Sequence, residues 1–322
     1  MKKRKLGNSG LELAPLALGG NVFGWTIDEP ASFQVLDAFA AAGFNFVDTA
    51  DMYSTWKPGN KGGESETILG NWMKKGGNRR KVLIATKVGM DMGAGMKGLS
   101  KDYILRAAEA SLRRLQTDYI DLYQAHTDDV TVPLQETLEA FGQLLKQGKV
   151  RAIGVSNYTA PRLSEALEVS KKHGLPRYES SQPLYNLYDR ADYEATLELV
   201  CRENGIGVIP YYSLASGFLT GKYRSEADLA KSPRGEGVKK YLNARGFRIL
   251  EALDQTATKY NSTPAQVSLA WLLTRPTVTA PIASATNVIQ LQELLEASNL
   301  QLDRESIELL DRASAIQASA PH

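Results

Sequence analysis

The sequence contains little cysteine and histidine and has almost no excess of charge of either sign. The single cysteine, Cys201, excludes an intrachain disulfide and a cysteine-rich metal site, and we predict no bound metal. The 38 Lys and Arg residues nearly balance the 36 Asp and Glu residues, which leaves a formal net charge of +2. This balance gives no reason to expect nucleic acid as a partner.

Long apolar runs are absent as well. Asp37, Asn45 and Asp48 interrupt the best candidate for a bilayer-spanning segment, so no membrane partner is expected. The basic start of the chain continues into Leu6–Gly10 rather than into an apolar stretch, which is unlike a secretory signal. Together with the single cysteine, these features predict a cytoplasmic protein.

A regular alternation of short strand patterns and amphipathic helix patterns begins at Leu16. Hydrophobic residues make up 43% of the chain and charged residues 23%, as in ordinary globular proteins. The alternation favours a parallel α/β architecture, and we predict a single (β/α)8 TIM barrel domain over residues 1–322. The eight predicted strands are Leu16–Leu18, Phe44–Val47, Val82–Thr86, Ile120–Gln124, Ala152–Val155, Glu179–Ser181, Gly207–Pro210 and Val278–Ile282.

Other segments fall outside the alternation or mark its boundaries. Residues 3–14 resemble a β-hairpin, which would plug the bottom of the barrel. Residues 221–245 are rich in Lys, Arg, Gly and Ser, and we predict a mobile loop at the barrel mouth. An extra helix is expected after Asp303. Glycines at 43, 148, 174 and 205 are predicted to end helices, and the Thr263–Gln266 pattern to begin one.

Four residues with acid–base or charged side chains follow three of the predicted strands. Asp48 and Tyr53 follow the second strand, Lys87 the third and His126 the fourth. Side chains at the carboxyl ends of barrel strands converge on one mouth. A tyrosine phenol has a pKa near 10, and we expect the Lys87 ammonium to lower that pKa while Asp48 holds the ammonium. His126 could orient a substrate oxygen or share its proton.

These residues lie in segments that resemble the aldo-keto reductase family. The carrying segments are Gly43–Tyr53, Ala85–Gly89 and Asp121–His126, and the resemblance extends from Leu16 to about Ala297. It implies a (β/α)8 barrel that binds NADP(H) without a Rossmann domain. It also implies reduction of an aldehyde or ketone, with Tyr53 as the general acid and Asp48, Lys87 and His126 as its catalytic partners.

The resemblance also implies a set of cofactor-binding residues. Ser156, Asn157 and Gln182 match residues that bind the nicotinamide carboxamide, and Tyr211, with Tyr212 as the competing choice, matches the residue that stacks on the ring. Gly20 and Asn21 would let the backbone approach the cofactor. The residues matched to the pyrophosphate and to the adenosine are Leu214, Ser216, Gly217, Lys222, Ser284, Thr286, Gln290 and Glu293.

Two departures from the family pattern concern the adenosine end. Thr286 stands where many relatives have a basic residue for the 2′-phosphate, and Leu294 stands where an asparagine usually contacts adenine. The resemblance implies NADP(H) as the cofactor, and these two departures leave NAD(H) or the use of both open. Trp25, Trp56 and Met90 fall on loops above the strands and could line an apolar substrate pocket, the alternative being exposed loop side chains with no role. The sequence predicts a small-molecule carbonyl substrate but neither its identity nor an oligomeric state.

Two alternative functions are compatible with the same residues. One is a nucleotide-sensing regulatory protein that resembles the potassium-channel β-subunits, which share this barrel and act on a partner. The other is a barrel enzyme in which Lys87 forms a Schiff base with a carbonyl substrate. The nearby tyrosine and histidine fit reduction better than Schiff-base chemistry.

Overall fold

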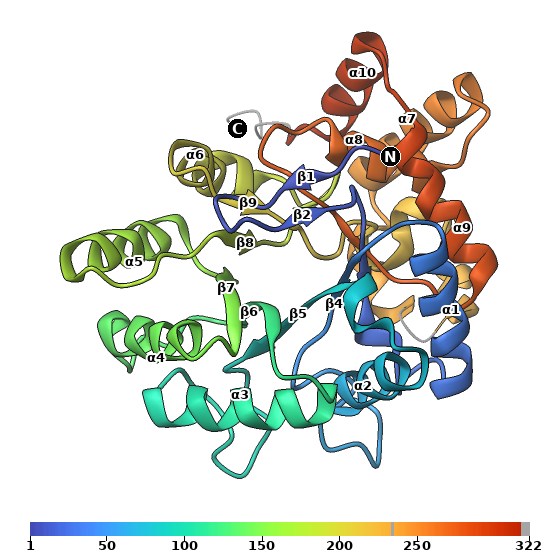
Figure 1. Ribbon diagram of the computed structural model, residues 1–322. Helices are drawn as coiled ribbons and strands as arrows, with labels where there is room; N and C mark the ends of the chain where they lie inside the picture. The colour runs from blue at the N-terminus through green and yellow to red at the C-terminus, as the bar shows by residue number, and fades with distance from the viewer. Residues whose placement is uncertain (233–234, 317–322) are drawn as a thin grey trace.

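A ring of parallel strands surrounded by helices forms the core of the computed structural model (Figure 1). The structure describes residues 1–232 and 235–316. Within these residues one sheet has the order β10-β3-β4-β5-β6-β7-β8-β9, and all its strands are parallel. Its strands are β3 (Ala17–Gly19), β4 (Phe46–Asp48), β5 (Leu83–Val88), β6 (Ile120–Ala125), β7 (Val150–Ser156), β8 (Ser180–Gln182), β9 (Gly207–Val208) and β10 (Ile282–Ala283).

The sheet closes between β9 and β10. Val208 forms a parallel bridge with Val278, and the amide of Thr279 donates to the Val208 carbonyl over 2.7 Å. The amide of Ile282 donates to the Pro210 carbonyl over 3.0 Å. The predicted (β/α)8 barrel is therefore confirmed. The last predicted strand, Val278–Ile282, is divided into a bridge and a two-residue strand, because Pro281 has no amide hydrogen to continue the ladder.

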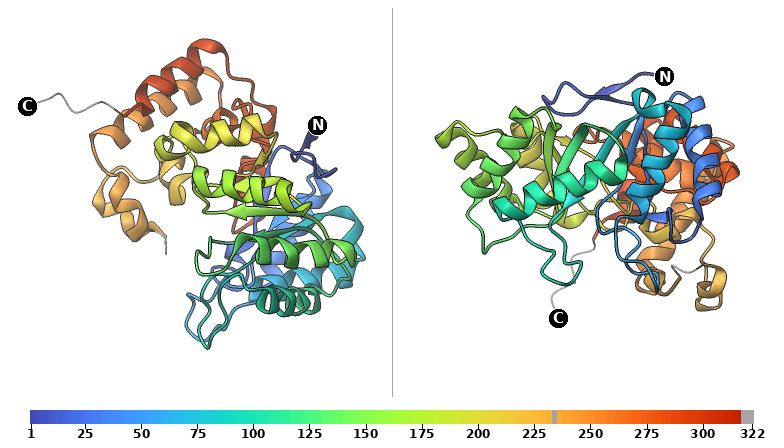
Figure 2. Two further views of the ribbon diagram at one scale, coloured as in Figure 1. Left: turned by 90° about the vertical axis from the view of Figure 1, so that its left-hand side faces the viewer. Right: turned by 60° about the horizontal axis from the view of Figure 1, so that its bottom comes forward.

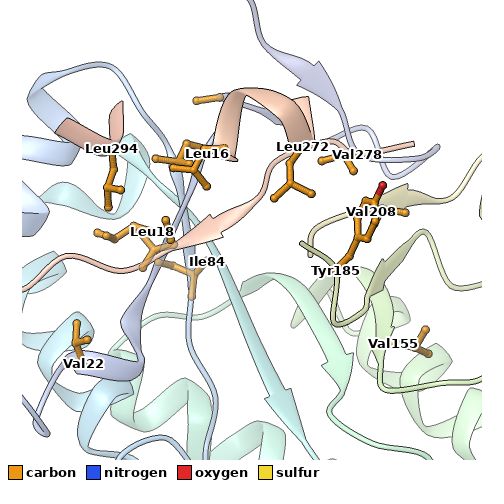
Figure 3. Close-up of a cluster of buried hydrophobic side chains, with 14 of the residues drawn as sticks. Leu16, Leu18, Val22, Ile84, Val155, Tyr185, Val208, Leu272, Val278 and Leu294 are labelled. Atoms are coloured by element: carbon orange, nitrogen blue, oxygen red, sulfur yellow. The ribbon is translucent and has the colours of Figure 1, made fainter. Parts of the chain in front are cut away.

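Helices pack around the outside of the strands, as Figures 1 and 2 show. They are α1 (Glu29–Ala41), α2 (Glu64–Gly76), α3 (Lys101–Leu115), α4 (Leu134–Lys146), α5 (Ala160–His173), α6 (Glu198–Glu203), α7 (Ala244–Lys259), α8 (Pro264–Leu273), α9 (Val288–Glu296) and α10 (Arg304–Ser314). Part of the apolar core between helices and strands appears in Figure 3, including the bridged pair Val208 and Val278.

The predicted helix boundaries are largely confirmed. The four glycines at 43, 148, 174 and 205 all have positive φ angles, between 61° and 82°. Thr263 and Gln266 form a reciprocal capping box at the start of α8. The extra helix after Asp303 is α10, and Asp303 caps it through the amide of Ser306.

Cys201 on α6 is buried, and burial raises the pKa of its thiol to about 12, so the thiol stays protonated.

The N-terminal hairpin closes one end of the barrel. β1 (Arg4–Lys5) pairs with β2 (Glu12–Leu13) in antiparallel register, as predicted. Leu6, Leu11 and Leu13 are buried in one cluster with the inward-facing side chains of the strands. The right-hand view of Figure 2 places this hairpin at one end of the barrel and the segment near residue 230 at the opposite end.

The segment 221–245 is more regular than a loop. It contains 3-10 helices at Glu226–Lys231 and Gly235–Tyr241, and α7 begins at Ala244. Ser225 and Asp228 form a capping box at the first of these helices. Pro233 and Arg234 lie outside the described residues. The expected position at the mouth is confirmed, because Lys231 and Ser232 line the cavity there, whereas the expected mobility stays a prediction.

Candidate active site

The alternation of side chains along the strands places the predicted acid–base residues inside the barrel. Phe46 of β4 and Ala85 of β5 belong to the inner cluster above the hairpin. Asp48 and Lys87 follow these residues by two positions, and side chains two positions apart share a face of a strand. Both therefore point into the barrel, one layer nearer the open end. The eight-strand ring thus builds the site directly on top of its apolar floor.

Tyr53, Lys87 and Asp48 are in direct contact. The Lys87 Nζ donates to the Tyr53 hydroxyl over 2.7 Å, to Oδ2 of Asp48 over 2.7 Å and to the Thr49 carbonyl over 2.8 Å. The Tyr53 hydroxyl also lies 3.1 Å from Oδ2 of Asp48. Lys87 is 0% exposed, so its amine is enclosed by three oxygen atoms and does not face the cavity. This arrangement does not favour a Schiff base at Lys87.

The electrostatics of this cluster differ from the expectation in one respect. Burial, followed by the negative charge of Asp48, raises the pKa of Tyr53 well above 10. We expected the Lys87 ammonium to lower this pKa, but desolvation and the carboxylate outweigh that attraction. Burial also lowers the pKa of Lys87, and Asp48 opposes this shift. Tyr53 is therefore a protonated phenol at neutral pH, which is the form that can donate a proton.

His126 lies beside Tyr53 as a neutral imidazole. The two ring centroids are 5.9 Å apart at an angle of 70°. Burial and the nearby Lys87 charge lower the pKa of His126 well below 6.5. Its Nδ1 atom is buried and has no protein partner among the described residues. The ring can therefore hydrogen-bond a substrate oxygen, but it does not supply a positive charge.

A cavity of about 1170 Å³ runs across the open end of the barrel from Tyr53 to α9. All but two of the predicted site residues line it. The lining members are Asp48, Tyr53, His126, Asn21, Ser156, Asn157, Gln182, Tyr211, Leu214, Ser216, Gly217, Lys222, Ser284, Thr286, Gln290, Glu293, Trp25, Trp56 and Met90. The exceptions are Lys87, which is enclosed, and Gly20. A side chain added at Gly20 would meet the Ser65 hydroxyl and the Asp48 carbonyl, and its neighbour Gly19 lines the wall instead.

A hydrogen-bonded group of amides and hydroxyls forms one wall beside Tyr53. Nε2 of Gln182 donates to Oδ1 of Asp48 over 2.8 Å, and the Ser156 hydroxyl donates to the Gln182 carbonyl over 2.9 Å. The Tyr211 hydroxyl donates to Oδ1 of Asn157 over 2.8 Å. This bond fixes the Tyr211 ring next to the amides, whereas Tyr212 is 50% exposed.

The far end of the cavity combines a turn with the start of α9. Ala215, Ser216 and Gly217 have consecutive positive φ angles of 48°, 57° and 97°. A side chain added at Gly217 would approach Nζ of Lys222 to 3.5 Å, so the space at this glycine borders an ammonium group. At the start of α9, Oε1 of Gln290 accepts hydrogen bonds from the amide and the hydroxyl of Thr286.

Some features of the site carried no clear signal in the sequence. The Thr49 carbonyl holds Lys87, and a backbone acceptor leaves no trace in residue type. Lys231 and Ser232 line the cavity, although only their segment was placed at the mouth. For Asp51, which lies near Tyr53, the sequence leaves loop solvation and a functional role equally open. The structure excludes loop solvation, because Asp51 is 1% exposed and neither carboxyl oxygen has a hydrogen-bond partner among the described residues.

Comparison with known proteins identifies the family. The family model described as "Aldo/keto reductase family" matches residues 15–315. The chain belongs to the aldo/keto reductase family. This match covers the whole barrel and every predicted site residue. Membership supports an oxidoreductase that acts on small-molecule carbonyl compounds in general.

Relatives with different printed names share this aldo/keto reductase barrel. The chain is 36% identical over 321 residues to "Uncharacterized oxidoreductase YrpG" of Bacillus subtilis (strain 168), covering 97% of this chain and 95% of that protein. It is 33% identical over 330 residues to "Protein tas" of Escherichia coli (strain K12), covering 95% of each.

A third relative bears on the regulatory alternative. The chain is 31% identical over 329 residues to "Probable voltage-gated potassium channel subunit beta" of Oryza sativa subsp. japonica, covering 100% of this chain and 98% of that protein. Because oxidoreductases match the chain at least as well, this similarity does not favour the regulatory alternative. No helix in the described part of the chain is both long and apolar enough to cross a membrane.

Proposed function

We propose that this protein is an NAD(P)H-dependent reductase that converts aldehydes or ketones to alcohols, with Tyr53 as the proton donor. The observation that carries this proposal is the contact of the Tyr53 hydroxyl with Lys87 Nζ, at 2.7 Å, beside the cavity. NADP(H) is the proposed cofactor, with NAD(H) as the alternative. A single buried thiol suits a reducing compartment, so we also propose a cytoplasmic location.

The residues of the cavity fit a nicotinamide dinucleotide. The amides of Asn157 and Gln182 and the hydroxyl of Ser156 offer the donors and acceptors that a carboxamide requires. The Tyr211 ring, fixed through Asn157, offers a flat face for a planar ring. The open space at Gly217 next to Lys222 suits a pyrophosphate, whose charge the ammonium would offset. The volume of about 1170 Å³ suits an extended ligand together with a small substrate.

The chain's own residues manage the proton in this reaction. When bound, the cofactor supplies a hydride to the carbonyl carbon. Tyr53 then gives its phenolic proton to the carbonyl oxygen, and the Lys87 ammonium stabilises the phenolate that remains. Asp48 keeps Lys87 in place, and Gln182 holds the second oxygen of Asp48. The neutral His126 orients the substrate oxygen by a hydrogen bond.

Replacing Tyr53 with phenylalanine tests this proposal. We expect kcat for reduction of an aldehyde to fall by on the order of a hundredfold or more, because the ring remains and only the proton donor is lost. The dissociation constant for NADPH, measured by fluorescence titration, is expected to stay within about threefold, because the binding wall of the cavity is intact. Tyr119→Phe is the matched control, because Tyr119 directly precedes β6 and does not line the cavity. Turnover by Tyr53→Phe equal to that of the wild type would remove Tyr53 from the acid role.

A further inference from the structure

A pocket at the closed end of the barrel lies apart from the cavity described above. It has a volume of about 330 Å³, and among the described residues it shares no lining residue with that cavity. The hairpin, the end of α1 and residues at the starts of β4, β5 and β7 border it. Figure 2 shows the hairpin at the end of the barrel opposite the segment near residue 230. We call this space the closed-end pocket.

Positive charge dominates the closed-end pocket. Among the described residues, four cationic side chains line it, from Lys3, Arg80, Lys81 and Arg151, against the single carboxylate of Glu12. All five residues are exposed, so a ligand in solution can reach their charged groups. The end of α1 adds the equivalent of roughly half a negative charge, which the four cations outweigh. An anion in this pocket is therefore attracted by cations from several elements.

Three of these cations have no carboxylate partner. The side chains of Lys3 and Arg80 form no hydrogen bond or ion pair within the described part of the chain. Nζ of Lys81 donates to Oδ1 of Asn78 over 2.8 Å, but this amide carries no charge that could neutralise the ammonium. Like charges that gather without a counter-ion repel one another, and a bound anion would relieve this repulsion.

The fourth cation, Arg151, is only partly neutralised. Its Nη1 lies 2.7 Å from Oδ1 of the buried Asp121. Nη2 of Arg79 lies 2.8 Å from Oδ2 of the same carboxylate, so one carboxylate serves two guanidinium groups. The Arg151 side chain is 49% exposed, and its remaining N–H groups are available to a further acceptor. Asp121 thus holds Arg151 at the pocket without cancelling its charge.

We propose that the closed-end pocket binds a phosphate group carried by a small molecule. A phosphate monoester has close to two negative charges at neutral pH and three acceptor oxygens, which suits several cations. The planar guanidinium groups of Arg80 and Arg151 can each donate two parallel hydrogen bonds to phosphate oxygens. The volume of about 330 Å³ also leaves room for a small organic part of the ligand.

The overall charge of the chain argues for a small molecule rather than a nucleic acid. A formal net charge of +2 provides little long-range attraction for a long polyanion, whereas the local excess in the pocket attracts a short one. The site is independent of the proposed reductase function, because it lies at the opposite end of the barrel from Tyr53.

Calorimetric titration of the full chain tests this site. The protein, with saturating NADPH, is titrated at about pH 8 and constant ionic strength, because phosphate is a dianion there. The ligands are inorganic phosphate, glycerol 3-phosphate and, as the uncharged control, glycerol. We expect both anions to bind saturably and glycerol not to bind. Lys222→Gln, which changes the cation of the other cavity, should leave the dissociation constant for glycerol 3-phosphate unchanged.

Replacing one unpaired cation tests the assignment to the closed-end pocket. Arg80→Gln should raise the dissociation constant for glycerol 3-phosphate by roughly fivefold or more, because a charged pair of hydrogen bonds is lost. In phosphate-free buffer its melting temperature should equal or exceed that of the wild type, because repulsion among the cations falls. Arg113→Gln removes an exposed arginine of α3 that does not line the pocket, and this control should retain the dissociation constant within about twofold.

Three results would overturn the proposal. One is the absence of saturable binding of both anions to the wild type. Another is an equal dissociation constant for glycerol 3-phosphate in Arg80→Gln and the wild type, which would place the anion elsewhere. The third is a short single-stranded oligonucleotide that binds more tightly than glycerol 3-phosphate and is weakened more by Arg80→Gln, which would assign the pocket to a nucleic acid. None of these readouts requires turnover, so they are independent of the reductase assay.

Discussion

Asp51 is the most unusual single residue of the fold. It lies two residues before Tyr53, its amide donates to the Lys87 carbonyl, and its carboxyl group is buried without a hydrogen-bond partner among the described residues. Burial, and then the negative charge of Glu66, raises the pKa of Asp51 to about 8, which Arg114 only partly opposes. The folded protein therefore binds a proton at Asp51 between about pH 4 and pH 8, and the unfolded chain does not.

Because of this residue, the free energy of unfolding of the protein should fall as pH rises. The stabilising contribution of the protonated form is present below the unfolded pKa of 3.8 and is lost as pH rises towards about 8. The side chain of Asp51→Asn stays uncharged. The free energy of unfolding of this variant minus that of the wild type should therefore increase between pH 5 and pH 8, by up to about 4 kcal/mol. Urea denaturation at several pH values measures this margin. Asp118→Asn, at an exposed position, is the matched control, and a constant margin for Asp51→Asn would contradict the prediction.

The proton donor itself predicts the pH dependence of catalysis. Reduction needs the protonated phenol, and burial with Asp48 raises the pKa of Tyr53 well above 10. His126 stays neutral because its pKa lies well below 6.5. We therefore expect kcat/KM for reduction to be flat between about pH 6.5 and pH 9. An alkaline decline centred below pH 8 in a steady-state profile would show that Tyr53 is not the buried phenol described above.

At this scale the sequence was informative about residue types and less so about their surroundings. The order of Asp48, Tyr53, Lys87 and His126 on strand ends predicted that they converge, because strand periodicity is a property of the chain. It could not predict that desolvation raises the pKa of Tyr53 by more than the Lys87 ammonium lowers it, since burial depends on every neighbouring element. The surroundings of Asp51 were open for the same reason. Its loop is polar in sequence, yet the structure buries its carboxyl group near Glu66 of α2 and Arg114 of α3.

At the scale of single elements, α5 offers a clean test of helix termination. Gly174 caps this helix with a φ of 62°, and no atom lies within 4 Å of a side chain added there. Gly174→Ala should therefore cost about 1 kcal/mol of unfolding free energy from backbone strain alone. Gly237 also has open space but an ordinary φ, so Gly237→Ala is the matched control and should not destabilise the protein. Thermal melting of both variants gives the comparison, and equal melting temperatures would refute the role of φ.

The same elements show why boundaries were predicted unevenly. The ends of helices that carry a glycine cap or a capping box were predicted well, because the residue types of three or four neighbouring positions determine such a cap. The helical turns in residues 221–245 were missed, although Ser225 and Asp228 carry a capping-box pattern. The Lys, Arg, Gly and Ser content of this segment favours a loop, whereas the helical signal is confined to the four residues from Ser225 to Asp228. The final strand was drawn too long because its apolar run contains Pro281, which interrupts the ladder.

At the scale of the whole molecule, the barrel separates stability from chemistry. The hairpin leucines fill the closed end, while the cavity occupies the opposite end. Leu13→Ala should lower the free energy of unfolding by about 2–5 kcal/mol through the space it leaves. The dissociation constant for NADPH should not change at temperatures where the variant is folded. Leu199→Ala, at a half-exposed position, is the control and should change stability by less than about 1 kcal/mol. Loss of cofactor affinity in folded Leu13→Ala would show that the two ends are coupled.

The pairing of β3 with β10 has a consequence for how the chain reaches this shape. β3 and β10 are neighbours in the sheet, yet they lie near opposite ends of the sequence. Arg4 reaches across the same join to the carbonyls of Val278 and Leu273. While the chain is being synthesised, the growing sheet keeps two unpaired edges, at β3 and β9, until β10 has left the ribosome. Those edges are the places where a nascent copy is most exposed to aggregation with another.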